Sequence, residues 1–356
     1  MIASKTRSGK NLSPERPAGR WTQVLSIFSE TNLFVSFVLL FLLSACGGGP
    51  DVTQSTGHGI LLATSQGLFN ISFSTNGSST LTSTTPIIAS GIDAMVAVEN
   101  ASYPINGPML VTTNGMTITA YSMTGGIPSA TGQTITPTSS CSPASINSLS
   151  VTPDGKYLLA TSLTGGTLSI ITLASGYACT STSTSNSTYP TSVAVECLQL
   201  NNPCQIFLTL STSHSSVSPT TPEALSWAEG KAPSSTPTLL TQLTPSASSV
   251  IFDNETSYFY TLVTASNNSS VYNVSGVTAL TSSSAYASNV SYGNVSFSNP
   301  CLDPLGQTLY TPTGNGSVYS SSVSTSGSIG SPQQIWSLAS NPSGVQISPI
   351  TACAVY

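Results

Sequence analysis

The sequence predicts an all-β protein, a β-propeller of six blades whose ring is closed by the C-terminal strand. Three observations support this prediction. Residues 149–173 (LSVTPDGKYLLATSLTGGTLSIITL) hold three β-prone runs, separated by turns at Pro153-Asp154-Gly155 and Gly165-Gly166. Runs of the same kind recur along the chain, and each end carries an incomplete unit. A three-stranded meander is too small to bury its own faces, so its copies have to pack on one another.

The spacing of the first strands predicts the number of blades. Equivalent apolar residues follow one another in steps of 53, 44, 56, 51 and 53 residues, and they are Val98, Val151, Val195, Ile251, Leu302 and Val355. Six first strands indicate six blades, and a seventh blade hidden in the longer intervals is the alternative. The Ser/Thr/Pro-rich intervals, such as residues 180–190 and 231–249, are expected to hold fourth strands and loops.

The strands are expected in this order along the chain: 60–63 and 68–73; 92–98, 109–112 and 116–121; 149–151, 157–160 and 168–173; 192–198, 205–210 and 224–227; 249–252, 258–263 and 270–274; 294–297 with Leu302, 308–311 and 317–319; and 350–356. The unit that begins at residue 60 lacks a first strand. Residues 350–356 (ITACAVY) have the pattern of a first strand and stop where the turn would follow. We therefore expect the C-terminal strand to complete the first blade, because closing the ring removes open sheet edges.

The N-terminus predicts export. Five of the seven basic residues precede an apolar run at residues 33–43, which is shorter than the roughly 20 residues needed to span a bilayer. Leu43-Ser44-Ala45-Cys46 follows, with glycines after it, and this segment resembles the lipobox of bacterial lipoproteins. The resemblance implies a signal peptide at residues 1–45, a diacylglycerol and palmitate anchor on Cys46, a flexible tether at 46–57 and a propeller domain at 58–356. The alternative is an ordinary signal peptide with an incidental cysteine.

The charge of the exported part is low and negative. From Cys46 onward two lysines, Lys156 and Lys231, stand against ten carboxylates, a formal net charge of −8. No basic patch is present to meet phosphates, so the sequence excludes nucleic acid as a partner. A surface of hydroxyls and amides keeps its charge when carboxylates protonate, which fits an acidic exterior. Compositional drift in a secreted protein explains the same composition equally well.

Six cysteines remain after Cys46, and an even number in an exported chain indicates three disulfides. Propeller geometry selects the pairs. Cys197 and Cys204 flank a short turn, Cys141 and Cys179 bracket the unit at residues 149–173, and Cys301 and Cys353 remain. The last pair would join the final internal blade to the closing strand. No CxxC spacing is present, so the cysteines do not predict a metal site.

The sequence assigns no catalytic, cofactor-binding or metal-ligating residue. Acidic residues near the first strands could form a ring at one end of the channel, where they would hold a divalent cation: Asp93, Glu99, Glu196, Asp253, Glu255 and Asp303. Turn positions are the preferred explanation, because Asp253-Asn254 and Asp303-Pro304 are turn dipeptides. Only His58 and His214 could serve a Ser-His-acid set, and neither GxSxG nor CxxCH occurs.

The segment TPDGKYLLAT (residues 152–161) resembles the repeat of bacterial YVTN-type propellers and also that of lactonase-like propellers; LDPLGQTLYT (residues 302–311) matches in part. The resemblance and the lipobox together favour a lipid-anchored envelope protein that uses a propeller as a binding or assembly surface. Its expected partners are the membrane, through the lipid, and another envelope protein or a surface glycan. Gly47 after the lipidated cysteine favours the outer membrane, by resemblance to Gram-negative lipoproteins. The alternative is a lactonase-like or metal-dependent hydrolase, which would cluster three or more of the acids at the channel mouth.

Overall fold

The computed structural model describes a β-protein within the compact unit Gln54–Tyr356. It describes residues 59–356 except 74–78, 139–140, 142–144, 185–186, 198–202, 215–218, 235–236, 241–246, 254–257, 264–267, 274–284, 292–297 and 338–348. Every regular element in this part of the chain is a strand. The described residues accordingly contain no helix that is long and apolar enough to cross a membrane. The segments predicted as signal peptide and tether, and Cys46 between them, lie outside the described residues.

The described strands form six antiparallel sheets, five of four strands and one of five. From the inner to the outer strand the sheets are β25 (Ile350–Val355), β1 (Gly59–Thr64), β2 (Gly67–Phe73) and β3 (Ser79–Leu81); β4 (Ala94–Ala101), β5 (Gly107–Thr113), β6 (Ile118–Thr124) and β7 (Ile127–Pro128), with β8 (Gln133–Ile135) also beside β6; β9 (Ile146–Val151), β10 (Tyr157–Ser162), β11 (Thr167–Thr172) and β12 (Cys179–Ser183); β13 (Tyr189–Glu196), β14 (Cys204–Ser211), β15 (Pro219–Trp227) and β16 (Thr238–Leu239); β17 (Ala247–Asp253), β18 (Tyr258–Val263), β19 (Asn268–Asn273) and β20 (Ala285–Ser291); and β21 (Cys301–Leu302), β22 (Thr308–Pro312), β23 (Ser317–Ser322) and β24 (Gln333–Ser337).

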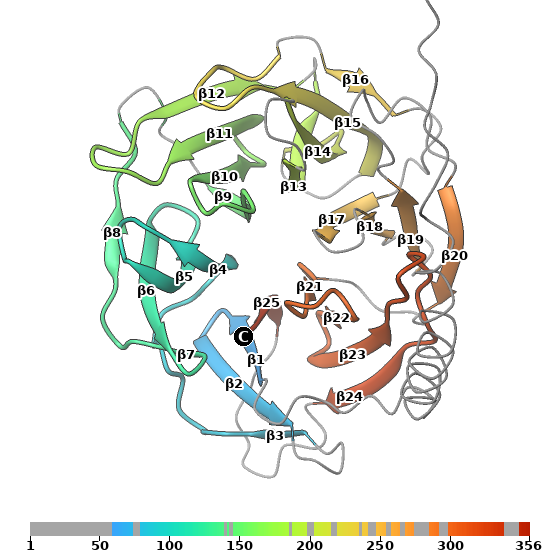
Figure 1. Cartoon of the computed structure of the whole chain (residues 1–356). Helices are drawn as coiled ribbons and strands as arrows, with labels where there is room; N and C mark the ends of the chain where they lie inside the picture. The colour runs from blue at the N-terminus through green and yellow to red at the C-terminus, as the bar shows by residue number, and fades with distance from the viewer. Residues whose placement is uncertain are drawn as a thin grey trace, which may run out of the picture. The chain divides into compact units, whose positions relative to one another are not determined.

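The sheets stand around a central axis as a β-propeller (Figure 1). The innermost strands β4, β9, β13, β17, β21 and β25 each contact the next around the ring, and β25 contacts β4. The six equivalent apolar residues of the sequence all lie on these innermost strands. Apolar clusters fill the spaces between neighbouring sheets, and one of them joins residues of β4–β6 to residues of β9–β11. The propeller class predicted from the sequence is confirmed.

The unit at residues 149–173 shows why these residues form a blade. Leu158, Leu159 and Ala160 of β10 are fully buried between the neighbouring strands. The preceding turn is held by Thr152, whose hydroxyl donates to Asp154 Oδ1 at 2.7 Å, while Gly155 adopts a φ of +69°. That backbone conformation favours glycine, which explains the Pro-Asp-Gly sequence.

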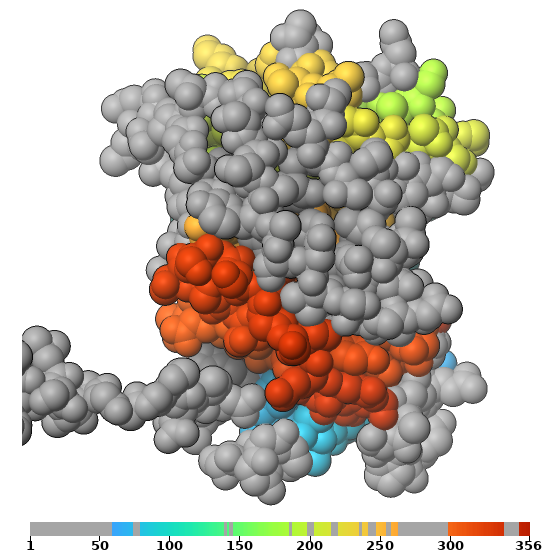
Figure 2. All heavy atoms as spheres, turned by 90° about the vertical axis from the view of Figure 1, so that its right-hand side faces the viewer, coloured from blue at the N-terminus to red at the C-terminus, as the bar shows by residue number. Residues whose placement is uncertain are grey.

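The ring closes where the sequence predicts. Strand β25 pairs antiparallel with β1, and Ile60 lies opposite Val355 and Leu62 opposite Cys353. Outer strands meet at the same seam, where the Ser79 hydroxyl of β3 donates to the carbonyl of Ile335 in β24. Figure 2 shows this side of the molecule, with the orange-to-red C-terminal segments beside the blue N-terminal ones.

Two intervals divide differently from the prediction. In residues 180–190 the outer strand β12 takes the first part, but Tyr189 and Pro190 already belong to the innermost strand β13. In residues 231–249 the outer strand β16 has only two residues, and β17 begins at Ala247. The innermost strands β9, β13 and β17 begin earlier than expected because the residues before their predicted starts also pair with the next strand. The expected strand 294–297 lies outside the described residues.

Three disulfides link the predicted pairs. Cys141 and Cys179 lie 5.8 Å apart between Cα atoms, Cys197 and Cys204 lie 4.4 Å apart, and Cys301 and Cys353 lie 5.5 Å apart. The last bond joins β21 to β25 next to the seam, which ties the two neighbouring sheets covalently.

Candidate functional site

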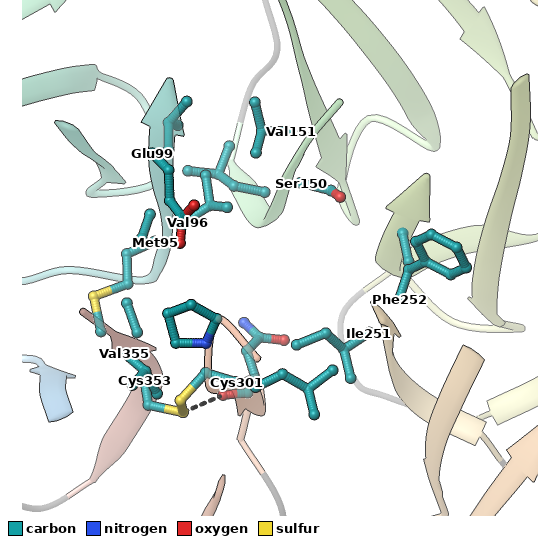
Figure 3. A pocket seen from close by; sticks show the side chains of 18 of the residues that line it. Met95, Val96, Glu99, Ser150, Val151, Ile251, Phe252, Cys301, Cys353 and Val355 are labelled. Carbon is teal, nitrogen blue, oxygen red and sulfur yellow. Dashed lines mark hydrogen bonds between the residues drawn. A yellow bond between two sulfur atoms is a disulfide. The ribbon is translucent and has the colours of Figure 1, made fainter. Parts of the chain in front are cut away.

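The central channel contains a cavity of about 520 Å³. All six innermost strands line it. Figure 3 shows labelled side chains of β4, β9, β17, β21 and β25 around it. This volume lies within the range of roughly 300–1,000 Å³ that is typical of small-ligand sites. The cavity is therefore the candidate functional site.

Polar side chains block the channel at the end where the innermost strands begin. Asn299, just before β21, donates from Nδ2 to the carbonyl of Asn147 in β9 at 3.4 Å. The two strands stand on opposite sides of the ring (Figure 1), so this contact crosses the channel. Asn147 is itself fixed, because its Nδ2 donates to the carbonyl of Thr191 at 2.7 Å and its Oδ1 accepts from the amide of Leu163 at 2.7 Å.

Buried serines extend this polar layer around the ring. The Ser148 hydroxyl of β9 accepts from the amide of Val193 in β13 at 3.3 Å, and the Ser192 hydroxyl accepts from the amide of Val250 in β17 at 3.2 Å. The described innermost strands of different sheets form no backbone hydrogen bonds with each other. The serine hydroxyls therefore accept from backbone amides that have no carbonyl partner on a neighbouring strand. The layer leaves the other end of the channel as the entrance.

The entrance lies where the innermost strands end. The exposed residues Glu99, Asn100, Pro153 and Pro304 line the cavity at this end. Further in, the wall is mostly aliphatic. Its half-buried apolar residues are Val96, Val151, Ile251 and Leu302, and Val355 is buried. The site thus has an apolar body, a polar floor and a mouth that is open to solvent.

Three of the six candidate acids line this one cavity: Glu99, Asp253 and Asp303. Asp303 acts in a turn, because its Oδ1 accepts the amide of Gln307 at 2.7 Å. Asp253 is 97% buried and packs against Gly306, whose φ of +63° gives the same turn that Gly155 gives in the earlier unit. Burial, and then the charge of Asp303, raise the pKa of Tyr310 behind β21 to about 12.

The other candidate acids lie elsewhere. Asp93 is exposed before β4, where partial burial raises the pKa of its carboxyl. Glu196 is buried at the end of β13 and does not line the cavity. Glu255 and His58 lie outside the described residues. His214 is exposed and packs its ring against Tyr189 at a centroid distance of 5.5 Å, away from the cavity.

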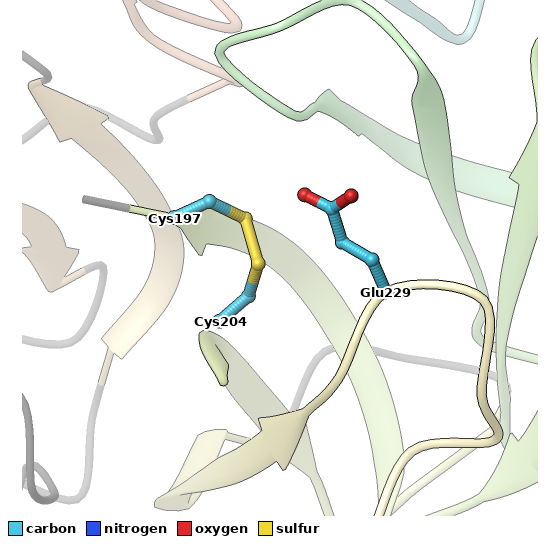
Figure 4. Close-up of side chains that lie close together, drawn as sticks. All are labelled: Cys197, Cys204 and Glu229. Atoms are coloured by element: carbon cyan, nitrogen blue, oxygen red, sulfur yellow. A yellow bond between two sulfur atoms is a disulfide. The ribbon is translucent and has the colours of Figure 1, made fainter. Parts of the chain in front are cut away.

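Within the described part of the chain, one group brings three potential metal-ligating residues within 4.8 Å: Cys197, Cys204 and Glu229 (Figure 4). The two sulfur atoms are bonded to each other, so neither is a thiolate that could hold a metal ion. The acids of the cavity do not form such a group. The described residues therefore show no preformed divalent-cation site for the metal-dependent form of the hydrolase alternative.

The sequence analysis missed the polar floor. Asn299, Ser148 and Ser192 each stand three residues before the equivalent apolar residue of their blade. A small polar residue repeated at this position, inside otherwise apolar strands, was the available signal. Once the register is known, the repetition predicts that these side chains meet at one level of the channel.

The comparisons with known proteins agree on the fold. No family model and no curated protein matches the sequence. Among solved structures, a chain of the nidogen/laminin complex is 11% identical with a TM-score of 0.55, covering 84% of this chain and 98% of that one. The periplasmic gluconolactonase of Pseudomonas aeruginosa is 13% identical with a TM-score of 0.52, covering 78% and 82%. A putative 6-phosphogluconolactonase of Bacteroides fragilis is 12% identical with a TM-score of 0.51, covering 80% and 82%. At these identities the likeness shows the fold alone, which is similar to that of lactonase-like β-propellers.

Proposed function

We propose that this chain is a lipid-anchored bacterial envelope protein whose six-bladed β-propeller is a binding module, with the channel cavity as its binding site. The observation that carries the proposal is the cavity itself: it is about 520 Å³, closed by side chains at one end and open at the other. A rigid ring that presents an apolar cavity is suited to capture a ligand without reacting with it. The group that binds in the cavity belongs to a partner, which is another envelope protein or a surface glycan.

The contacts of the acids favour binding over catalysis. Asp303 is engaged by a backbone amide and Asp253 is packed against Gly306, so neither carboxylate is placed as a general base. A hydrolase would need an activated nucleophile or a metal ion in the cavity. Three serines line the cavity, Ser148, Ser150 and Ser192, and none of the described residues that line it with them is a histidine.

A neutral dye tests the cavity as a binding site. The probe is Nile red, whose fluorescence rises in an apolar environment, and the test variant is Ser150→Trp, which fills the cavity from its half-buried wall. The matched control is Ser90→Trp, which adds the same side chain at an exposed position between β3 and β4. We expect the parent and Ser90→Trp to bind the dye and Ser150→Trp to lose at least about tenfold in affinity, since roughly 1.4 kcal/mol of lost contact gives that factor. Equal binding by the two variants would show that the cavity is not the site.

Fatty-acid labelling tests the anchor. Cys46→Ser should abolish labelling, because a serine hydroxyl does not form the thioether to diacylglycerol. Two or more acyl chains are needed for stable anchoring at about 0.8 kcal/mol per buried CH₂, so the variant should also leave the membrane fraction. Cys141→Ser together with Cys179→Ser serves as the control for loss of cysteine elsewhere. Label retained by Cys46→Ser would refute the lipoprotein assignment.

A second candidate function is lactone hydrolysis, and one observation favours it: three of the candidate acids line a single cavity. The cavity is negatively charged, so an uncharged aldonolactone suits it better than a phosphorylated one. Release of acid from gluconolactone and from 6-phosphogluconolactone, measured by pH-stat against Glu99→Gln, decides the question. If the protein hydrolyses the uncharged lactone and Glu99→Gln abolishes that activity, lactone hydrolysis replaces ligand binding as the proposed function.

A further inference from the structure

We propose that the ligand group which enters the cavity is an alkylammonium, a positively charged nitrogen on an aliphatic body. This inference rests on the proposed binding function and specifies its ligand. It follows from two properties of the same cavity, the sign of its charge and the chemistry of its wall.

The cavity has a negative charge that none of the described residues lining it balances. Three carboxylates line it, from Glu99, Asp253 and Asp303. From Cys46 onward the sequence holds only two basic residues besides its histidines, Lys156 and Lys231, and neither lines the cavity. Lys156 is paired with Asp154 at 2.6 Å, and both lysines are exposed. Carboxylates in a cavity with low-dielectric walls concentrate the field at its mouth, which attracts a cation and repels an anion.

Glu99 is the carboxylate placed to receive that cation. It lies on β4 at the entrance, next to Asn100, and Figure 3 shows its side chain beside Met95 and Val96. Within the described residues it makes no hydrogen bond and no ion pair, whereas Asp303 accepts a backbone amide and Asp253 is buried against Gly306. Glu99 thus keeps its capacity to bind a ligand cation at the point where the cavity meets solvent.

The wall behind Glu99 suits an aliphatic body. Figure 3 shows Val96 and Val355 on its side of the channel, Val151 on β9 and Ile251 on β17. Leu302 of β21 lines the cavity as well. Removing such a body from water contributes roughly 0.8 kcal/mol for each CH₂ that the wall covers. The head then stays near the mouth, so its charge remains partly hydrated and avoids the cost of full desolvation.

The cavity discriminates between ligands by charge. A carboxylate or phosphate on the same aliphatic body would meet three like charges without a lysine or arginine to receive it, so it should bind more weakly than an uncharged alcohol. The expected order of affinity is alkylammonium, then alcohol, then carboxylate.

Isothermal titration calorimetry with three eight-carbon probes tests the inference: octyltrimethylammonium, 1-octanol and octanoate. Glu99→Gln removes the charge and keeps the shape of the side chain. Glu229→Gln is the matched control, because it makes the same change at an exposed position outside the cavity. We expect Glu99→Gln to lower the affinity for octyltrimethylammonium by about tenfold and to leave the affinity for 1-octanol unchanged. Glu229→Gln should change neither affinity. A partly hydrated ion pair supports a factor of this size.

The outcomes separate the ligand class from the binding function. If Ser150→Trp blocks all three probes but the parent shows no preference for the cation, the alkylammonium class is wrong and the cavity stays a binding site. If Glu229→Gln weakens the cation as much as Glu99→Gln does, the preference comes from net charge and the assignment of Glu99 is overturned. If Ser150→Trp leaves octyltrimethylammonium binding intact, both the ligand class and the binding function are overturned.

Discussion

At the scale of single residues, Tyr356 stabilises the closed ring at the sheet that joins the two ends of the propeller domain. Its hydroxyl accepts from Asn70 Nδ2 at 2.9 Å and donates to Asn70 Oδ1 at 3.1 Å, which joins the C-terminal residue to β2 of the same sheet. Its ring lies on Gly126 in the turn after β6 of the next sheet, so close that a Cβ on Gly126 would stand 1.4 Å from the ring. One side chain therefore connects two sheets at the edge of the cavity.

Gly126→Ala should destabilise the fold by about 3 kcal/mol. The φ of +78° costs an alanine roughly 1 kcal/mol, and displacement of the Tyr356 ring costs its packing and the two hydrogen bonds to Asn70. Gly125→Ala is the matched control, since Gly125 has a φ of +56° with nothing near a Cβ, and it should cost only about 1 kcal/mol. Urea unfolding measures both. Equal losses in the two variants would show that Tyr356 does not hold the turn.

Composition and spacing predict which residue types the site contains, but they predict less well where each residue lies. Glu99, Asp253 and Asp303 could be found because acids near first strands converge in any ring. Asp93 could not be separated from them, since it precedes β4 while Glu99 lies near the end of that strand, and the sequence does not show the exact bounds of the strand. The floor residue Asn299 carries no recognisable motif, and its role appears only when opposite strands are brought together.

At the scale of elements, β25 has two roles that a shorter strand could not combine. It is the innermost strand of the sheet that begins with β1, and its residues Ala352, Cys353 and Ala354 are almost fully buried. It also carries Cys353, which is bonded to Cys301 in the neighbouring sheet. In the chain-entropy model a crosslink across 52 residues contributes roughly 4 kcal/mol.

Deletion of residues 350–356 should abolish cooperative unfolding. The deletion exposes the inner edge of β1, opens the ring between two sheets and removes one disulfide. The double variant Cys301→Ser with Cys353→Ser separates the disulfide from the strand, and it should unfold cooperatively with about 4 kcal/mol less stability. Thermal unfolding followed by circular dichroism distinguishes the two. A deletion variant that melts like the parent would contradict closure by β25.

The elements themselves were largely predictable, for a physical reason. Three-stranded units need turns, and turns need residues such as Gly155 and Gly306, so the strands between them stand out in the sequence. The outer strands were harder to place. β12 and β16 are partly exposed and short, so they lack the apolar alternation that marks a buried strand.

At the scale of the whole molecule, stability comes from apolar clusters between sheets and from hydroxyl hydrogen bonds, with little from ion pairs. In the described part of the chain one salt bridge is present, between Lys156 and Asp154. It is exposed, and such pairs contribute at most about 1 kcal/mol. Among the described residues, two carboxyls have shifted pKa values and so contribute to the pH dependence of stability: those of Asp93 and Asp154.

These two carboxyls act in opposite directions. Burial raises the pKa of the Asp93 carboxyl above its usual 3.8, so the folded state disfavours its ionised form. Its penalty is complete above the raised pKa and disappears as the pH falls toward about 4. Burial also raises the pKa of Asp154, but hydrogen bonds from the Lys156 ammonium, the Thr152 hydroxyl and the Lys156 amide together bring it below 3.8. Its stabilisation is complete above about pH 4 and is lost as the pH falls through the lowered pKa.

Two asparagine variants should therefore give opposite slopes of stability against pH. In Asp93→Asn only the stabilising contribution of Asp154 remains. The free energy of unfolding should therefore fall as the pH is lowered from 5 to about 3. In Asp154→Asn only the destabilising contribution of Asp93 remains. The free energy of unfolding should therefore rise as the pH is lowered from about 6 toward 4. Each change should stay below about 1 kcal/mol because both side chains are largely exposed to solvent, and in the parent the two partly cancel. Urea unfolding at a series of pH values measures the slopes. If both variants lose stability in acid to the same extent, groups other than these two control the response and the low charge of the surface does not make the fold insensitive to acid.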